Sequence, residues 1–232
     1  MCTLIVVNGL DADPRMIVGA NREERYDRPA LPPNIISRNP TVLGPMDLEA
    51  GGSWLTINDA GVIVAVTNRR DGLPGSRSRG LLVRDVASQR TYEDSLAVAQ
   101  RSFEEEQYAG CNLLLASSDQ VNLFEWDGTL QSHDLQPGIH VIVNEGFDES
   151  VAKSAVLRSR LAASPPSRGS EWQERMQTLL TDHYVGVCRH DNTSGTRSSS
   201  LVSQFRDRTV QWQFADGNPC NTPFSDVWHD RL

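Results

Sequence analysis

The 232-residue chain contains almost no lysine: Lys153 is the only one among 22 basic residues. With 30 acidic residues the formal net charge is −8, whereas proteins that bind nucleic acids usually carry an excess of positive charge. The sequence also lacks any run near the roughly 18 apolar residues of a membrane-spanning helix. No basic segment precedes the first apolar stretch, so we expect no signal peptide. These absences predict a cytoplasmic protein with no nucleic-acid partner and no integral membrane association.

Cysteine is scarce, and its spacing excludes several functions. The four residues are Cys2, Cys111, Cys188 and Cys220, and none of them forms a CxxC pair. Structural zinc and thioredoxin-type chemistry are therefore not expected. Disulfides are not expected in a chain without a secretory signal. Cys111 and Cys188 are predicted to be buried small hydrophobic residues. The sequence thus predicts no metal site.

A glycine pair at Gly51-Gly52-Ser53-Trp54 invites comparison with a phosphate-binding loop. Such loops need a lysine directly after a glycine, and the only lysine lies elsewhere in the chain. We therefore disfavour nucleotide hydrolysis and expect no cofactor. The glycines are predicted to allow close backbone packing or a bulge before the next strand.

Hydrophobic patterning predicts hairpins separated by helices. Two strand pairs are expected at 2–8 with 15–21 and at 54–57 with 62–68, with a proline-rich loop at 29–40 between them. Helices are expected near 79–88, 91–106, 150–162 and 171–181, and Thr91 with Asp94 resembles a capping box. Further strands are expected at 111–117, 121–126, 139–143, 198–206 and 209–214, followed by a coil-like tail. This order indicates a layered α+β fold, and we predict a single domain over residues 1–232.

Cys2 has the strongest chemical potential in the sequence. A small residue at position 2 permits removal of Met1, which would leave Cys2 with a free α-amine. That amine titrates at roughly 7.7–8.0 and a free thiol near about 8.5, so one residue can supply a nucleophile and its own base. Many chains begin with Met-Cys by chance, so this feature alone is weak.

Asparagine ends three apolar strands. Asn21 opens the segment Asn21-Arg22-Glu23-Glu24, Asn68 is followed by Arg69, and Asn144 ends the strand at 139–143. Amide groups stabilise developing negative charge without titrating. A carboxylate can orient an amine, and an arginine can bind a carboxylate or phosphate through two hydrogen bonds. Taken singly, each segment is more often an ordinary turn or surface sequence.

Together, these segments resemble the NRDE family, also called the transport and Golgi organisation 2 family, which is related to N-terminal nucleophile (Ntn) hydrolases. The motifs that carry the likeness keep the family's order over nearly the whole chain. They are Met1-Cys2-Thr3, Asn21-Arg22-Glu23-Glu24, Asp47-Leu48-Glu49-Ala50-Gly51-Gly52-Ser53-Trp54-Leu55, Ala65-Val66-Thr67-Asn68-Arg69, Ser78-Arg79-Gly80, Cys111-Asn112-Leu113-Leu114, Gly138-Ile139-His140-Val141-Ile142-Val143-Asn144 and Gly195-Thr196-Arg197-Ser198-Ser199.

The resemblance implies a four-layer αββα sandwich and an N-terminal cysteine hydrolase. By likeness to the penicillin V acylase and bile-salt hydrolase branch, Cys2 would be nucleophile and base. Glu23, one methylene longer than the family's Asp, would contact the amine. Asn68 and Asn144 would donate to the oxyanion. The implied substrate-binding residues are Asn21, Arg22, Arg69 and Arg197. The implied reaction is hydrolysis of a non-peptide amide, or acyl transfer, through a Cys2 thioester.

A non-catalytic carrier of haem or of an acyl-CoA or lipid ligand is the alternative reading. Haem needs a ligand that faces an apolar pocket. His140 lies inside an apolar strand and is predicted to be a satisfied core histidine, while Cys188-Arg189-His190 offers two weak candidate ligands. In both readings the partner is a small molecule, and the sequence leaves the oligomeric state open.

Overall fold

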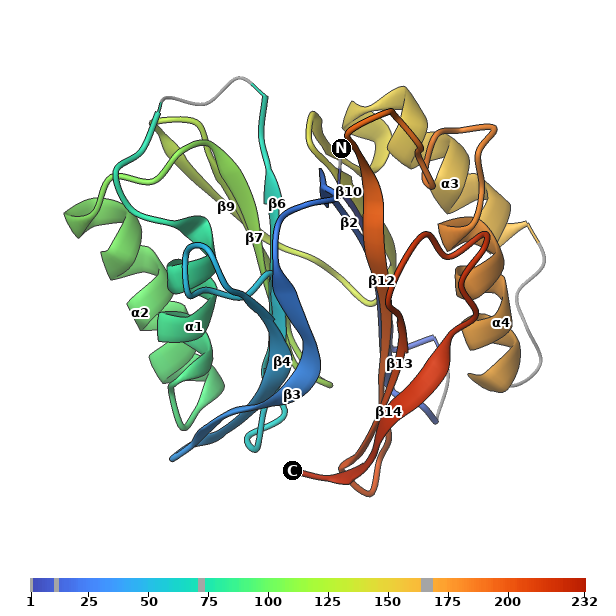
Figure 1. Cartoon of the computed structure of the whole chain (residues 1–232). Coiled ribbons are helices and arrows are strands. Elements are labelled where there is room, and N and C mark those ends of the chain that lie inside the picture. Colours follow the sequence, from blue (N-terminus) through green and yellow to red (C-terminus); the bar gives the residue numbers. More distant parts are fainter. Residues whose placement is uncertain (1, 11–12, 71–73, 164–168) are drawn as a thin grey trace. The chain divides into compact units, whose positions relative to one another are not determined.

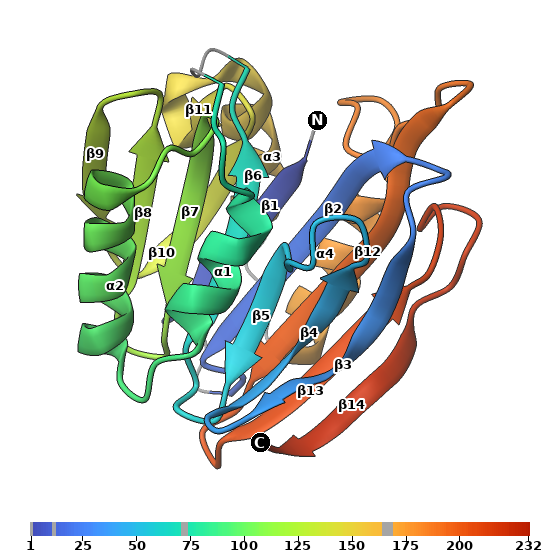
Figure 2. The same cartoon turned by 60° about the vertical axis from the view of Figure 1, so that its left-hand side comes forward.

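The structure of the protein is a computed structural model that describes residues 2–10, 13–70, 74–163 and 169–232. These residues form two compact units. One comprises the chain up to Asp27 together with Pro137–Arg231, and the other comprises Arg28–Gln136 with Leu232. Each unit contains one seven-stranded antiparallel sheet (Figures 1 and 2). In the described ranges, no helix combines the length and apolar character needed to cross a membrane. The expectation of a single domain stays a prediction.

The first unit is built around the strand that follows Cys2. Its sheet has the order β11-β10-β1-β2-β12-β13-β14. These strands are β1 (Thr3–Asn8), β2 (Met16–Arg25), β10 (Gly138–Val143), β11 (Gly146–Phe147), β12 (Ser194–Gln204), β13 (Thr209–Ala215) and β14 (Ser225–Arg231). Every residue of β1 is buried, as its apolar sequence predicts, and β1 pairs with β2 as the expected hairpin.

Helices α3 (Ala152–Ala162) and α4 (Gly169–Leu180) cover one face of this sheet, and a short 3-10 turn at Asp148–Ser150 precedes α3 (Figure 1). The core between them joins Ile5 and Val141 of the sheet to Leu157, Trp172 and Met176 of the helices. Both helices lie close to their predicted ranges. The sheet residues in this core establish which side of each strand faces the helices.

The second unit is a meander whose strands follow one another in chain order. They are β3 (Ala30–Arg38), β4 (Thr41–Asp47), β5 (Leu55–Asn58), β6 (Ile63–Asn68), β7 (Cys111–Ala116), β8 (Val121–Trp126) and β9 (Leu130–Asp134). Helices α1 (Arg79–Ala87) and α2 (Tyr92–Glu105) follow β6 and precede β7 in the chain, and they cover one face of this sheet (Figure 2). The predicted cap of α2 is confirmed, because the Thr91 Oγ1 accepts the Asp94 N–H at 3.0 Å.

Two sequence predictions of irregular structure are wrong. The proline-rich stretch is strand β3, and its pairing with β4 shifts between Leu31 and Asn34, where Pro32 and Pro33 lie. Proline cannot donate to a neighbouring strand, but β3 is at the edge of its sheet and the shift accommodates it. The tail after Pro223 is also an edge strand, β14, instead of coil. The short strands β9 and β11 were not predicted either.

The glycine pair before β5 has the packing role that the sequence predicts. A Cβ added to Gly52 would lie 2.3 Å from the carbonyl carbon of Gly80 in the first turn of α1. The next residue, Ser53, donates its backbone N–H to the Gly80 carbonyl at 3.0 Å. Gly51 has a φ of +67°, a conformation that L side chains rarely adopt. The glycines therefore let β5 and α1 approach closely.

Candidate functional site

Cys2 lies immediately before the central strand of the first unit. It is half-buried and forms no disulfide within the described residues. Met1 lies outside the described residues, so its removal stays a prediction. The first residue of β1, Thr3, pairs with Asn21 on β2 and with Val143 on β10. The two neighbouring strands thus bring the segments that begin at Asn21 and Asn144 to the same end of the sheet as Cys2. Three segments far apart in the sequence meet there.

Strand alternation divides the predicted residues between the two faces of the sheet. Val143 packs in the core beneath the helices, so Asn144, one residue further, belongs to the opposite face. Cys2 belongs to that opposite face by the same alternation, since Thr3 is the register partner of Val143. Arg22 also belongs to it and is buried, with only 7% of its surface exposed. Cys2, Arg22 and Asn144 are therefore placed on one face at one end of this sheet.

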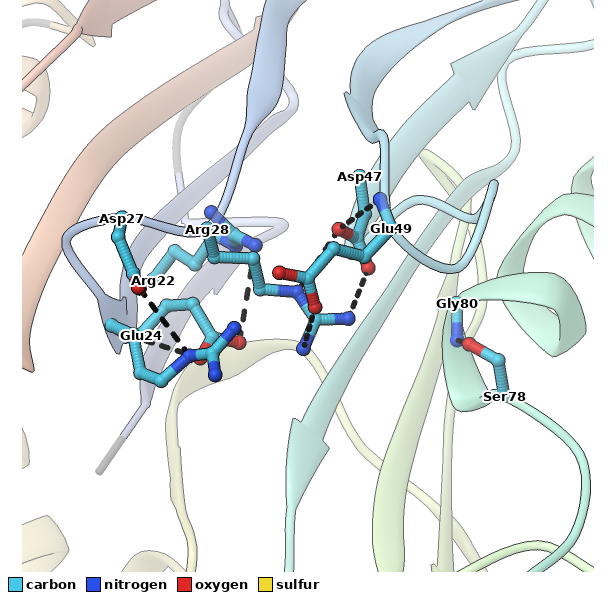
Figure 3. A network of polar contacts seen from close by, with 9 residues as sticks. Arg22, Glu24, Asp27, Arg28, Asp47, Glu49, Ser78 and Gly80 are labelled. Atoms are coloured by element: carbon cyan, nitrogen blue, oxygen red, sulfur yellow. Dashed lines mark hydrogen bonds and ion pairs between the residues drawn. The ribbon is translucent and has the colours of Figure 1, made fainter.

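Arg22 is accompanied by a carboxylate on its own strand. Its Nη2 lies 3.9 Å from Oε2 of Glu24, two residues further along β2 (Figure 3). Residues two apart in a strand share a face, so the ion pair and the alternation agree. Glu24 therefore lies on the face of Arg22 and Cys2, whereas its neighbour Glu23 is the carboxylate that the sequence predicted for the site.

Asn21 points toward the helices. Its Nδ2 donates to the Leu180 carbonyl at 2.8 Å and to the Val187 carbonyl at 3.0 Å, and the side chain is buried. Both donors of the amide are thereby used to hold the chain that leaves α4. Glu23 is half-buried, lies two residues beyond Asn21 and pairs in register with Thr196. Alternation assigns Glu23 to the face that Asn21 occupies.

Arg197 lies at an irregularity of β12. The register of β12 against β2 shifts between Thr196 and Ser198, so Arg197 is the extra residue of a bulge. Bulges re-aim a side chain and often occur beside functional sites. The Arg197 Nη1 forms an ion pair with Asp216 Oδ1 at 3.0 Å. That contact holds the guanidinium toward the end of β13.

The remaining predicted residues, Asn68 and Arg69, belong to the second unit. Asn68 is the exposed last residue of β6. The Arg69 guanidinium forms an ion pair with Glu125 and donates to Asn112 Oδ1 at 3.4 Å. Both charged side chains are mostly buried, with 11% and 14% exposed. Arg69 therefore has a structural partner on β8, which the sequence did not predict.

A second carboxylate–arginine cluster in this unit was missed as well. Arg28 donates from Nε to Asp47 Oδ1 at 3.0 Å and from Nη2 to Asp47 Oδ2 at 2.5 Å (Figure 3). Its Nη1 also lies 3.5 Å from Glu49 Oε2. A fork-shaped guanidinium matched to a carboxylate is among the stronger ion pairs. The available signal was the Asp47-Leu48-Glu49 segment, which the resemblance had singled out without a role.

The predictions for single histidine and cysteine residues can be compared directly with the structure. His140 is a satisfied core histidine, as predicted: it is buried, and its Nδ1 lies 2.8 Å from Asp148 Oδ2. Cys111 is fully buried, and desolvation raises the pKa of its thiol to about 12. Cys188 is also buried, as predicted. It belongs to the one group of potential metal ligands found in the described ranges, His183, Cys188, His190 and Cys220.

Solved structures with the same architecture define the fold class. An N-acylethanolamine-hydrolyzing acid amidase ortholog from Caenorhabditis elegans matches with a TM-score of 0.61 at 16% identity, over 86% of this chain and 92% of that one. The C2A mutant of conjugated bile acid hydrolase from Clostridium perfringens matches with a TM-score of 0.54 at 9% identity, over 100% and 98%. Penicillin V acylase from Agrobacterium tumefaciens matches with a TM-score of 0.52 at 10% identity, over 100% and 99%. Two antiparallel sheets with four helices match these structures, so the predicted Ntn-hydrolase αββα fold class is confirmed.

Sequence relatives then identify the family. The chain belongs to the Transport and Golgi organisation 2 family, which matches residues 1–214. The Transport and Golgi organization 2 homolog of Mus musculus is 29% identical over 229 residues, and the human homolog is 35% identical over 227 residues. Each match covers 81% of this chain and 81% of the relative. The family resemblance seen in the sequence is confirmed.

Proposed function

We propose that this protein is an N-terminal cysteine hydrolase that cleaves a non-peptide amide bond, or transfers an acyl group, through a thioester on Cys2. The observation that carries the proposal is that Cys2 lies directly before the first residue of β1, on one sheet face with Arg22 and Asn144. A nucleophile needs nearby groups that bind substrate and stabilise negative charge. The partner of this site is a small molecule.

The proposed reaction begins with removal of Met1. The free α-amine of Cys2 then takes the thiol proton, and the sulfur forms a bond with the amide carbonyl carbon. The C–N bond breaks, and the leaving nitrogen takes a proton from the ammonium group. Water, or an acceptor alcohol or amine, then attacks the thioester, loses a proton and releases Cys2. Cys2 thus supplies both the nucleophile, through its thiol, and the general base and acid, through its α-amine.

The other residues take the roles that the family resemblance implies. Asn144 and Asn68 donate to the oxyanion, and each such donor contributes about 10²–10³-fold to the rate in well-studied hydrolases. The resemblance assigns contact with the α-amine to Glu23, while alternation assigns Glu24 to the face of Cys2. Arg22 binds an anionic group of the substrate, Arg69 and Arg197 support substrate binding, and Asn21 supports the site from the opposite face by holding the chain that leaves α4. Arg22 is the best placed of these, because alternation assigns it to the face of Cys2.

The names of the structural relatives support this reaction class. They denote an acid amidase that hydrolyses N-acylethanolamines, a conjugated bile acid hydrolase and a penicillin acylase. One of those structures is a C2A mutant, so that relative also has a cysteine at its second position. The low identities show the fold alone, and the substrate of this chain is open.

The first test is the intact mass of the purified protein before and after reaction with a β-lactone, which acylates activated thiols. We expect loss of Met1 and a single acyl adduct. The adduct should disappear in Cys2→Ala and persist in Cys111→Ala, because the Cys111 thiol is fully buried and its pKa is raised to about 12. A Cys2→Ser variant keeps the amine with a weaker nucleophile and should label more slowly.

Retention of Met1 with no preferred adduct at Cys2 would overturn the hydrolase proposal. Haem or acyl-CoA carriage would then be the function to test. A carrier should bind such a ligand stoichiometrically, and Cys2→Ala should bind it as tightly as the unaltered chain does. A hydrolase should instead lose turnover of an amide substrate in the same variant.

A further inference from the structure

Two histidines and two cysteines from separate segments of the first unit come together beside the end of α4. They are His183 and Cys188 in the loop after α4, His190 just before β12, and Cys220 in the loop between β13 and β14. One potential ligand atom from each residue lies within 4.8 Å of all the others. Cys188 is buried, Cys220 is half-buried and the two histidines are exposed. The cluster thus has a buried floor and an opening to solvent.

Two of the three distances among Cys188, His190 and Cys220 match those of a tetrahedral zinc site. With zinc–sulfur bonds near 2.3 Å and zinc–nitrogen bonds near 2.0–2.1 Å, tetrahedral angles place two sulfurs about 3.8 Å apart and a sulfur and a nitrogen about 3.6 Å apart. The Cys188 and Cys220 sulfurs are 3.7 Å apart, and the Cys188 sulfur is 3.7 Å from His190 Nε2. His190 Nε2 to Cys220 Sγ is shorter, at 3.1 Å. A disulfide needs about 2.05 Å between sulfurs, so these cysteines are not bonded to each other.

The histidine rings are oriented for metal binding. The His183 Nδ1 lies 3.0 Å from the Cys188 carbonyl oxygen. Because a carbonyl oxygen can only accept a hydrogen bond, Nδ1 carries the proton and donates it. This contact leaves the other nitrogen, Nε2, with its lone pair free for a ligand bond. Zinc-binding histidines in proteins commonly donate a hydrogen bond from their second ring N–H to a backbone carbonyl in this way. His190 presents Nε2 directly to both sulfurs.

Backbone hydrogen bonds fix the loops that carry the ligands. The Asp182 carbonyl accepts the Val187 and Cys188 N–H groups at 3.0 and 2.8 Å, and the Asp182 carboxylate accepts the Val185 N–H at 2.9 Å. On the other side, the Asn218 carbonyl accepts from Asn221 at 2.9 Å, which closes a turn around Cys220. The ligands are therefore positioned by the fold and not only by one another.

The charge of the donor set matches a divalent cation. A bound divalent ion deprotonates a coordinating thiol outright. Two thiolates and two neutral imidazoles then neutralise a dication without any further group. Buried sulfur beside imidazole is the donor set that zinc prefers over magnesium or calcium.

We propose that His183, Cys188, His190 and Cys220 bind one zinc ion in a closed, structural site. Four protein ligands leave no open position for a substrate, which distinguishes such a site from a catalytic one. The ion would join the loop after α4 to the loop before β14. Asn21 donates to the carbonyl of Val187, the neighbour of Cys188, so the site also buttresses the end of β2. This proposal is independent of the chemistry of Cys2 and replaces the sequence prediction of no metal.

The test is a cobalt titration of the reduced, chelator-treated full chain, because tetrahedral Co²⁺ bound to thiolates is coloured. We expect intense d–d bands and a thiolate-to-cobalt charge-transfer band that saturate at about one ion per chain, and that stoichiometric Zn²⁺ abolishes. Metal analysis of protein purified without chelator should find about one zinc per chain. A reduced wild-type chain that shows neither thiolate bands nor bound zinc would overturn the proposal, and no variant is needed for that result.

Variants assign the ligands. Cys188→Ser and Cys220→Ser should each lose most of the charge-transfer intensity and the bound zinc. Cys2→Ser and His229→Gln are matched controls, since Cys2 is another half-buried cysteine and His229 an exposed histidine outside the cluster. Both controls should keep one ion. Zinc should also raise the unfolding temperature of the wild type and not that of Cys220→Ser. Loss of the ion in Cys2→Ser with retention in Cys188→Ser and Cys220→Ser would place the metal elsewhere and refute the assignment.

Discussion

Replacing Asn21 tests whether this residue binds substrate or holds the fold. Its amide donates at 2.8 and 3.0 Å to the carbonyls of Leu180 and Val187, both of which are fully buried residues. Asn21→Ala removes both donors and leaves two buried carbonyls without them. Each unsatisfied buried group costs about 1–3 kcal/mol, so we expect the free energy of unfolding to fall by about 2–6 kcal/mol.

Asn21→Asp sharpens the test because it keeps the shape and removes the donors. The introduced carboxyl would face two carbonyl oxygens, and burial raises the pKa of a carboxyl that has no partner. Its pKa in the folded state would lie above its unfolded value of about 3.9, so ionisation favours unfolding. The ionisation penalty is therefore absent below about pH 4 and grows as the pH rises toward the folded-state pKa. At neutral pH we expect Asn21→Asp to be less stable than Asn21→Ala.

Urea unfolding followed by tryptophan fluorescence and circular dichroism measures both variants, and coincident transitions justify a two-state treatment. Asn192→Ala, an exposed asparagine in the same unit, is the control and should change stability by no more than about 0.5 kcal/mol. A stability loss in Asn21→Ala as small as that of the control would refute the reasoning. Asn21 would then act on the substrate, as the family resemblance implies.

Three further predictions concern the site and its supports. Glu23→Gln should slow acylation of Cys2 by at least about tenfold and Glu24→Gln by less, because Glu23 is the predicted partner of the α-amine. If mass spectra of samples quenched at successive times show slower acylation in Glu24→Gln than in Glu23→Gln, that role belongs to Glu24, on the face of Cys2. Arg69→Ala should lower the free energy of unfolding by about 1–3 kcal/mol, since the mostly buried Glu125 carboxylate loses its guanidinium partner and keeps His133 Nε2 at 3.0 Å. Replacing both partners by apolar residues should recover much of this loss, and urea unfolding that shows no recovery would contradict a structural pair. Gly52→Ala should destabilise by about 1–3 kcal/mol, because its Cβ would lie 2.3 Å from a backbone carbon of α1; a midpoint unchanged in urea would mean that the backbone yields.

The sequence by itself determined most of the secondary structure and the family. Short apolar runs such as 3–8 and 111–116 indicate strands that are buried on both faces, and both are fully buried strands. The Thr91 cap and the glycines before β5 are local signals, because they depend on neighbours within a few residues. The order of the motifs along the chain indicated the Ntn fold class through the family resemblance.

The tertiary structure decided what no local pattern encodes. β3 is a strand in spite of its prolines, because an edge position tolerates residues that cannot donate to a neighbour, and β14 forms an edge of the other sheet. Register, and not spacing, placed Asn21 toward the helices and Arg22 on the face of Cys2, since a shift of one residue would exchange the two faces. The cluster that includes Cys188 and Cys220 joins residues 32 apart in the sequence. Such a set has no sequence motif, because its ligands meet only when separate loops are folded against one sheet.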